Sequence, residues 1–294
     1  MKKPVYVVDA MNYIHRAYYS LPDSITAPNG MLTNAVFGYL RTLLRIINER
    51  KPEYIAAAFE GDTSFRNRLF VDYKANRKQP PDNLEAQFDL CRKITEAIGV
   101  ACVEVDDYEA DDVIGTIATR MSSLGYRVVV VTGDKDMSQL VSESVYVYDM
   151  GKGQFFDEAG VYEKFGVSPR QIPDLLALHG DQIDNIPGVM GVGEKTARQI
   201  LSVCGTIEDL TDTNLNTKLR FRGRDEILRR IRENIETVRI SRKLATICCD
   251  APLNVSPDTL RYRGGDRSTL DPLCRELGFA QVVAEIPLAQ PLLF

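Results

Sequence analysis

Short apolar runs alternate with longer amphipathic stretches along the first half of the chain. The runs with the length and composition of buried strands are Val5–Asp9, Tyr54–Phe59, Val100–Val105, Tyr126–Thr132 and Ser144–Tyr148. Between them, Asn34–Arg50 and Leu84–Ile98 place apolar residues three and four positions apart, which predicts helices. Strands that alternate with helices predict a mostly parallel central sheet with helices on both faces, so the expected fold class is α/β.

The signals for strands fade after about residue 157, and the rest of the chain is predicted to be helical. The expected helices are Val161–Phe165, Pro169–Leu178, Glu194–Leu201, Arg224–Arg239 and Ser268–Leu277. We therefore expect three parts: an α/β domain over residues 1–178, a helical region over residues 179–252, and a tail over residues 253–294 that packs back on the rest.

Acidic residues follow three of the predicted strands. They are Asp9 at the end of the first run, Glu60 and Asp62 after the second, and Asp134 and Asp136 after the fourth. The carboxyl ends of parallel strands meet at one edge of a sheet, which is where open α/β sheets bind ligands. Carboxylates crowded there repel one another unless a cation lies among them.

A second acidic cluster, Glu109, Asp111 and Asp112, heads the helix predicted before the fourth strand. Oxygen ligands with no nearby His or Cys suit magnesium or manganese better than zinc. The alternatives are that these acids cap the helix, where the helix dipole favours them, and that Asp134 and Asp136 form a turn. Because both clusters belong to one helix–strand unit, a two-metal phosphoryl-transfer site is the favoured hypothesis.

The net charge of −5 hides a segregation of basic residues. Ser64–Pro80 carries five basic residues and one acid, and Lys218–Lys243 carries ten basic residues and four acids. An acidic site flanked by basic stretches fits a metal-dependent enzyme that acts on a polyanion. The alternative is that the basic runs are solvated helix faces.

A glycine-rich turn follows two further acids, Asp181 and Asp184, in the sequence HGDQIDNIPGVMGVGEK. Such a turn at the start of a helix points backbone N–H groups at an anion. A dinucleotide-binding turn needs a preceding strand, but a predicted helix and Pro187 precede this one. A helix–hairpin–helix that grips a DNA phosphate fits better, and a connection that binds nothing is the alternative.

The sequence argues against a membrane protein and against an N-terminal targeting segment. No apolar run reaches 18 residues, so no membrane span is expected. The first residues resemble a strand and not a targeting segment. The six cysteines have no metal-binding spacing and predict free thiols in a reducing cytoplasm. We expect a monomer with no membrane partner.

Three motifs, YEADDVIGTIA, VVTGDKDMSQLV and GDQIDNIPGVMGVGEKTA, resemble the 5′-nuclease family. That family comprises the 5′→3′ exonuclease domain of bacterial DNA polymerase I, its stand-alone relatives and the flap endonucleases. The resemblance runs from Pro4 to about Phe279. It implies a 5′-nuclease fold with a helical arch, and a metal-dependent 5′→3′ exonuclease or structure-specific flap endonuclease that removes primers or flaps in DNA replication and repair.

The resemblance also implies which acids hold two magnesium or manganese ions. Carried over by motif, they are Asp9, Glu60, Glu109, Asp111, Asp112, Asp134, Asp136, Asp181 and Asp184. The sequence departs from the family at FEGDTSFR, where Glu60 stands in the place of an Asp and Asp62 is the alternative. Glu60 is favoured because its longer side chain can reach the metal.

Residues 63–98 match the arch through which the family threads a 5′ single strand. The resemblance assigns Lys74 and Arg77 to charge on the phosphate and Tyr73 to stacking on a base, with packing under the arch as the alternative for Tyr73. Arg66 and Lys78 would contact DNA. The hairpin would hold the downstream duplex through Gly188, Gly191, Gly193, Lys195 and Thr196, and would bind a potassium ion.

The expected substrate is therefore branched, flap or nicked DNA, including RNA–DNA primer junctions. Three rivals remain. An aspartate-phosphorylated receiver domain explains less than half of the chain. A catalytically weak or inactive module that binds branched DNA is kept open by Glu60. A ribonuclease on a related sheet would prefer single-stranded RNA.

Overall fold

The computed structural model describes residues 2–211 and 218–289. A sheet in the order β3-β2-β1-β4-β5-β6 forms its centre. The strands are β1 (Val5–Asp9), β2 (Tyr54–Ala58), β3 (Ala101–Val103), β4 (Val128–Val131), β5 (Val145–Asp149) and β6 (Gln154–Phe156). The first five are parallel, which confirms the predicted sheet, and β6 pairs antiparallel with β5. The sequence analysis did not predict β6.

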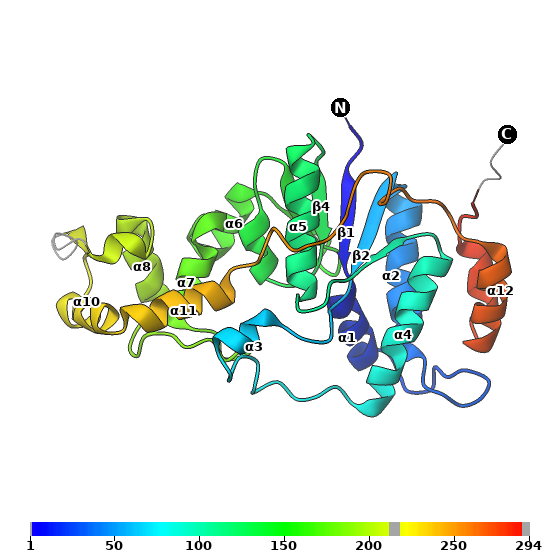
Figure 1. Ribbon diagram of the computed structural model, residues 1–294, viewed down its shortest axis with the longest axis horizontal. Helices are drawn as coiled ribbons and strands as arrows, with labels where there is room; N and C mark the ends of the chain where they lie inside the picture. Colours follow the sequence, from blue (N-terminus) through cyan, green and yellow to red (C-terminus); the bar gives the residue numbers. More distant parts are fainter. Residues whose placement is uncertain (1, 212–217, 290–294) are drawn as a thin grey trace.

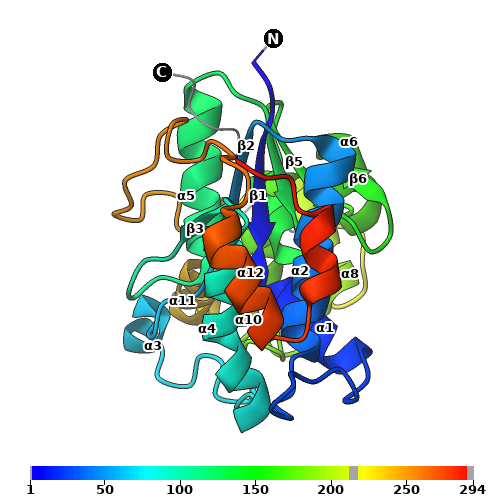
Figure 2. The same ribbon diagram turned by 90° about the vertical axis from the view of Figure 1, so that its right-hand side faces the viewer.

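The two faces of the sheet are covered by different helices (Figures 1 and 2). Val5 and Val7 of β1 belong to one apolar cluster with α5 (Ala110–Ser123). Val8 belongs to the other cluster, with residues of the helices α1 (Ala10–Ser20), α2 (Asn34–Arg50) and α4 (Asp82–Ala97). Alternate residues of a strand point to opposite faces, so a strand that is apolar throughout can serve both clusters.

The strand register gathers the ends of three strands around Asp9. Asp9 pairs with Ala58 of β2, and Val8 pairs with Val131 of β4. The residues that follow β2 and β4 therefore lie on either side of Asp9. This edge of the sheet carries the cleft described below.

The segment that was predicted to form an arch contains two helices. It consists of α3 (Phe65–Leu69), turns and irregular structure over residues 70–81, and α4. The prediction of part helix and part loop is confirmed. In Figure 1 this segment runs below the sheet, from α3 to α4.

The second half of the chain is helical, as predicted. Its helices, 3₁₀ turns included, are α6 (Glu158–Phe165), η2 (Pro169–Gln171), α7 (Ile172–His179), α8 (Glu194–Cys204), η3 (Glu208–Thr211), α10 (Arg224–Glu233), α11 (Ile235–Ala245), α12 (Arg267–Glu276) and η4 (Ala280–Glu285). A further 3₁₀ turn, η1 (Asp136–Leu140), follows β4. No described helix is long and apolar enough to cross a membrane.

The single helix predicted over Arg224–Arg239 is wrong. The chain breaks at Asn234 into α10 and α11. The backbone N–H and the side-chain amide of Asn234 both donate to the carbonyl of Arg230, at 3.0 and 2.8 Å. An Asn side chain that bonds to the backbone in this way competes with helix continuation.

After α11 the chain returns to the sheet domain along α5. The backbone N–H of Cys248 donates to the Asp112 carboxylate at 2.8 Å, and that of Ala251 donates to the Thr116 hydroxyl at 3.0 Å. Further on, Arg261 forms an antiparallel bridge with Tyr54 of β2. The helix α12 then lies beside α4 (Figure 2).

Candidate active site

A cleft of about 400 Å³ opens at the carboxyl ends of β1, β2 and β4. It is lined by Asp9, Met11, Asn12, His15, Tyr19, Glu60, Lys74, Arg77, Lys78, Pro80, Ala110, Asp111, Asp134, Ile183 and Asp184. The structure thus brings together five of the acids predicted to bind metal and three of the basic residues predicted to face the substrate. These residues come from the sheet edge, the first turn of α5, the arch and the loop before the hairpin.

Asp9 lies at the centre of the cleft and is held by two hydrogen bonds. Its carboxylate accepts from the Thr132 hydroxyl at 2.7 Å and from the Asn12 backbone N–H at 3.0 Å. Burial raises the pKa of Asp9 to about 6, with a further contribution from Asp134 and Glu60, although the two hydrogen bonds lower it. The hydrogen bonds fix the orientation of a carboxylate that is crowded by other acids.

The same crowding affects neighbouring acids. Burial and the Asp134 and Asp9 carboxylates raise the pKa of Asp111 well above its usual value. Burial and Asp134 also raise the pKa of Asp136 to about 7. Carboxylates that disfavour one another's charge are the arrangement that a divalent cation relieves.

The donor set is chemically suited to a hard cation, because every acid in the cleft offers oxygen and no Cys lines it. Within residues 2–211 and 218–289, no three His, Cys, Asp or Glu side chains already converge closely enough to hold a metal ion. The carboxylates instead contact protein donors such as Thr132 and Lys74. A bound cation would have to draw them together.

Glu60 and Asp62 differ in their placement. Glu60 lines the cleft, and burial raises its pKa. Asp62 is exposed and does not line the cleft. The geometry favours Glu60 as the acid of this strand end.

Lys74 reaches into the cleft from the arch. Its Nζ lies 2.8 Å from Glu109 Oε1, and its side chain is 19% exposed. Burial lowers the pKa of Lys74, but Glu109 and Asp111 outweigh this effect and the pKa is raised overall. Arg77 pairs with Asp184, and Lys78 is exposed at the rim. The arch therefore presents permanent positive charge to the cleft.

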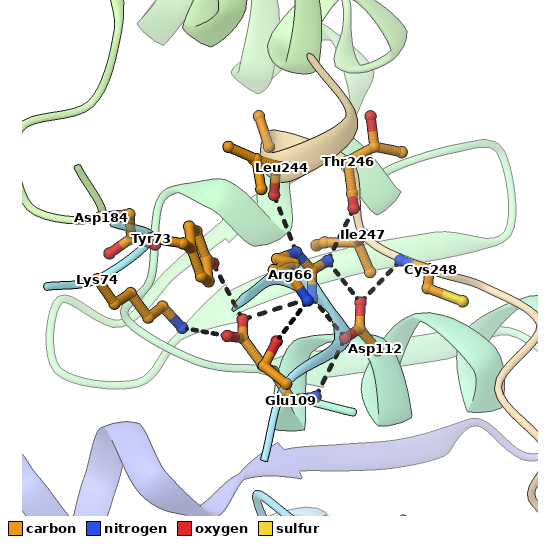
Figure 3. Close-up of polar contacts among 12 residues, drawn as sticks. Arg66, Tyr73, Lys74, Glu109, Asp112, Asp184, Leu244, Thr246, Ile247 and Cys248 are labelled. Carbon is orange, nitrogen blue, oxygen red and sulfur yellow. Dashed lines mark hydrogen bonds and ion pairs between the residues drawn. The ribbon is translucent and has the colours of Figure 1, made fainter. Parts of the chain in front are cut away.

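Asp112 and Arg66 are paired in the interior and do not line the cleft. Both Asp112 carboxylate oxygens accept from the Arg66 guanidinium at 2.7 Å. Figure 3 shows Arg66 between this carboxylate and the backbone carbonyls of Leu244 and Thr246, to which it donates at 2.9 and 2.8 Å. Arg66 is 2% exposed and Asp112 is 0% exposed. Because each is buried against the other here, this geometry does not support DNA contact by Arg66 or metal binding by Asp112, and both stay predictions.

Glu109 and Tyr73 also lie behind the cleft. The Tyr73 hydroxyl donates to Glu109 Oε2 at 3.2 Å, and Arg66 lies 3.5 Å from the same oxygen (Figure 3). Tyr73 is 4% exposed, so its ring has no free face for a base. The structure supports the alternative of packing under the arch. Burial raises the pKa of Glu109, but Lys74 and Arg66 outweigh it and hold the pKa below its usual value.

The remaining predicted acids, Asp136 and Asp181, lie beside the cleft without lining it. Lys135 Nζ is 2.9 Å from Asp181 Oδ2, and the Ile183 backbone N–H donates to the other oxygen at 2.8 Å. The Asp136 backbone N–H donates to Asp134 Oδ1 at 2.8 Å. Direct metal contact by Asp136 or Asp181 stays a prediction.

The glycine-rich turn joins α7 to α8, which gives the predicted helix–hairpin–helix order of elements. Gly191 has φ +86°, in the region that favours glycine. A Cβ on Gly188 would lie 2.4 Å from the carbonyl carbon of His179, so the close approach of the two backbones requires glycine there. Gly193 precedes α8, where Lys195 is exposed and Thr196 is half-buried. Phosphate and potassium binding by this turn stay predictions.

Sequence reasoning missed the residues that orient the acids. Thr132 bonds Asp9 and also accepts from the Asp134 backbone N–H at 3.0 Å. Asn12 accepts from the Gly133 backbone N–H at 3.2 Å. Both positions lie within three residues of a predicted acid, and this adjacency was the available signal.

Family models match nearly the whole of this chain. The 5′–3′ exonuclease N-terminal resolvase-like domain matches residues 4–166, and the 5′–3′ exonuclease C-terminal SAM fold matches residues 167–268.

Curated relatives include full-length polymerases and a stand-alone protein. DNA polymerase I of Bacillus caldotenax is 39% identical over 95% of this chain and 32% of its own length. The chain thus spans about a third of the polymerases that it matches. A protein of Aquifex aeolicus described as a 5′–3′ exonuclease is 34% identical over 97% of this chain and 95% of its own length.

Solved structures share the fold. A complex of the bacteriophage T5 D15 flap endonuclease with DNA and metal ions superimposes with a TM-score of 0.67 at 20% identity, over 95% of this chain and 100% of that one. The catalytic core of Rad2 in complex with DNA substrate gives 0.61 at 14% identity, over 97% and 93%. The domain matches over residues 4–268 and the 34% identical protein of Aquifex aeolicus show that the chain belongs to the 5′–3′ exonuclease family.

Proposed function

We propose that this protein is a metal-dependent 5′ nuclease that hydrolyses DNA phosphodiesters near 5′ ends in branched or nicked duplexes, as an exonuclease or a flap endonuclease. Its role would be the removal of primers or flaps in replication and repair. One observation carries the proposal: five acids from the sheet edge, from its neighbouring loops and from the first turn of α5 line one cleft together with three basic residues of the arch.

The acids of the cleft, Asp9, Glu60, Asp111, Asp134 and Asp184, would hold magnesium or manganese. When bound, such an ion lowers the pKa of a coordinated water and neutralises charge on a leaving oxygen. Thr132 and Asn12 keep the Asp9 oxygens in one orientation, which limits the rearrangement that binding requires.

Lys74 and Arg77 would stabilise negative charge on the phosphate in the transition state. Each is held by a carboxylate in the protein without DNA, Lys74 by Glu109 and Arg77 by Asp184. A fixed cation needs little reorganisation when charge develops beside it, and that is the usual source of a large electrostatic effect on rate. The proposed mechanism assigns no proton transfer to either of the two His residues.

The turn between α7 and α8 would hold the duplex by its backbone, with Lys195 and Thr196 beside the N–H groups that begin α8. Contacts of this kind position a duplex without reading its sequence. We therefore expect the shape of the junction to matter more than its base sequence.

The test is cleavage of a 5′-labelled flap duplex with magnesium, with manganese and with chelator. We expect cutting near the junction that requires metal, and an Asp134→Ala variant that binds the flap without cutting it. Tight binding by the wild-type protein without cutting in either metal would support the rival function, an inactive module for branched DNA. That rival is motivated by Glu60, which stands where the family has an Asp.

A further inference from the structure

Two turns meet beside the cleft, and each contains a non-glycine residue in the left-handed backbone region. We call Asp72–Arg77 the lysine turn and Asp181–Asn185 the acidic loop. Lys74 has φ +56° and Asn185 has φ +53°. Asn adopts this conformation more readily than most residues, whereas a Lys there needs support from its surroundings.

The Asn185 side chain supplies that support on both sides of Lys74. Its Nδ2 donates to the backbone carbonyl of Asp72 at 2.7 Å, and its Oδ1 accepts from Asn76 Nδ2 at 3.0 Å. Asp72 and Asn76 lie two residues before and two residues after Lys74. An amide can donate and accept at one position, and a carboxylate of the same shape can only accept.

Asp184, the neighbour of Asn185, forms two further hydrogen bonds with the lysine turn. Its backbone carbonyl accepts from the Lys74 backbone N–H at 2.9 Å, and its carboxylate accepts from Arg77 Nε at 3.0 Å. Lys74 and Asp184 both line the cleft, whereas Asn185 does not. Asn185 can therefore act on the reaction only through the residues that it holds.

We propose that Asn185 is a positioning residue for phosphodiester hydrolysis. It fastens the lysine turn to the acidic loop, so that the Lys74 ammonium and the Asp184 carboxylate keep a fixed relation across the cleft. The proposal rests on the proposed function, which assigns Lys74 to the phosphate. It adds a residue outside the cleft whose loss should act on the rate and not on the affinity.

Two variants separate the side chain from the backbone. Asn185→Gly keeps the left-handed conformation accessible and removes both side-chain bonds. Asn185→Asp keeps the shape and the acceptor but loses the donor to the Asp72 carbonyl, so it should be impaired as well. Asn254→Gly is the matched control, because Asn254 is exposed in the return segment after α11 and does not line the cleft.

The first measurement is a double-mutant cycle with Lys74→Ala, using single-turnover cleavage of the flap duplex. We expect Asn185→Gly to slow cleavage by about 10- to 100-fold in the wild-type background, which is the scale for misplaced catalytic groups. Flap affinity in chelator and the melting temperature should be unchanged. In the Lys74→Ala background, Asn185→Gly should cost much less, because only its effect through Asp184 remains. Equal loss in both backgrounds would overturn the proposal.

The second measurement needs no cleavage and separates this proposal from the proposed function. Amide hydrogen exchange of Lys74, whose N–H donates to Asp184, should quicken in Asn185→Gly and stay as in the wild type in Asn254→Gly. Unchanged exchange at Lys74 would overturn the fastening role. A wild-type protein that cuts no flap in any metal would refute the proposed function, and the exchange result would still decide whether Asn185 holds the lysine turn.

Discussion

The Arg66 guanidinium and the Asp112 carboxylate form a two-point ion pair in the interior, with both N–O distances at 2.7 Å. The pair joins the base of the arch to the start of α5. Two backbone carbonyls at the end of α11 accept from the same guanidinium. Removal of this ion pair should therefore lower the stability of the fold before it affects cleavage.

Asp112→Asn should lower the free energy of unfolding by about 3 kcal/mol, because the buried arginine loses its two-point counter-charge and keeps only the more distant Glu109. Urea denaturation in chelator measures the loss. Asp111→Asn is the matched variant: it removes an acid whose pKa is raised by burial and by neighbouring carboxylates, so it should abolish cleavage without lowering stability. An Asp112→Asn protein of wild-type stability that fails to cleave would return Asp112 to the metal site.

Lys74→Ala should slow the chemical step by about 10²- to 10³-fold, the usual effect of removing a group that stabilises transition-state charge. Single-turnover cleavage measures the rate, and a gel shift in chelator measures the affinity, which should change little. Lys93→Ala is the control, because Lys93 is exposed on α4 and does not line the cleft. Weaker binding with an unchanged rate would make Lys74 an anchor for DNA.

Glu60→Gln and Asp62→Asn test which acid serves the end of β2. Glu60 lines the cleft and Asp62 is exposed, so Glu60→Gln should raise the magnesium concentration needed for half-maximal cleavage and Asp62→Asn should not. A magnesium titration of flap cleavage by each variant gives the comparison. The reverse ranking would assign the position to Asp62.

Stability without metal should fall as the pH rises from about 5 to 7 and level off above about 7.5. Burial and Asp134 raise the pKa of Asp136 to about 7, so the folded chain holds a proton there that the unfolded chain has already lost. The stabilising contribution of this group is full only below the unfolded pKa, declines as the pH rises towards the folded pKa of about 7, and is lost above it. Thermal melting in chelator should show the decline, and Asp136→Asn should flatten it. A melting temperature that rises over this interval in the wild type would contradict the assignment.

A strong helical periodicity of apolar residues predicted a helix correctly where all the apolar positions of that helix are buried on one side. The helix expected over Asn34–Arg50 coincides with α2, because its apolar positions all face the same cluster. The helix α1 was not predicted from the sequence, because Asp9 both ends β1 and caps α1 with no intervening loop. Neither was β6, whose three residues include the exposed Gln154 and Phe155 and carry little apolar signal.

The cleft was predictable because parallel strands bring their ends together, and this placed Asp9, Glu60 and Asp134 correctly at one edge. The distinction between Asp111 and Asp112 was not predictable. Adjacent residues on a helix point in different directions, so only one of the two faces the cleft. The partner of Asp112 is Arg66, which lies 46 residues away in the sequence, and no local sequence pattern indicates this pairing.

The segment that follows α11 and contains Cys248 and Ala251 gives the helical region a second covalent attachment to the sheet domain. Hydrogen bonds from Cys248 and Ala251 fasten this segment along α5, while the first attachment enters through α6 and α7. A single break in the backbone between α8 and α10 would leave each half of the region still anchored. New chain termini placed there by circular permutation should therefore be tolerated better than in a domain that hangs from one linker.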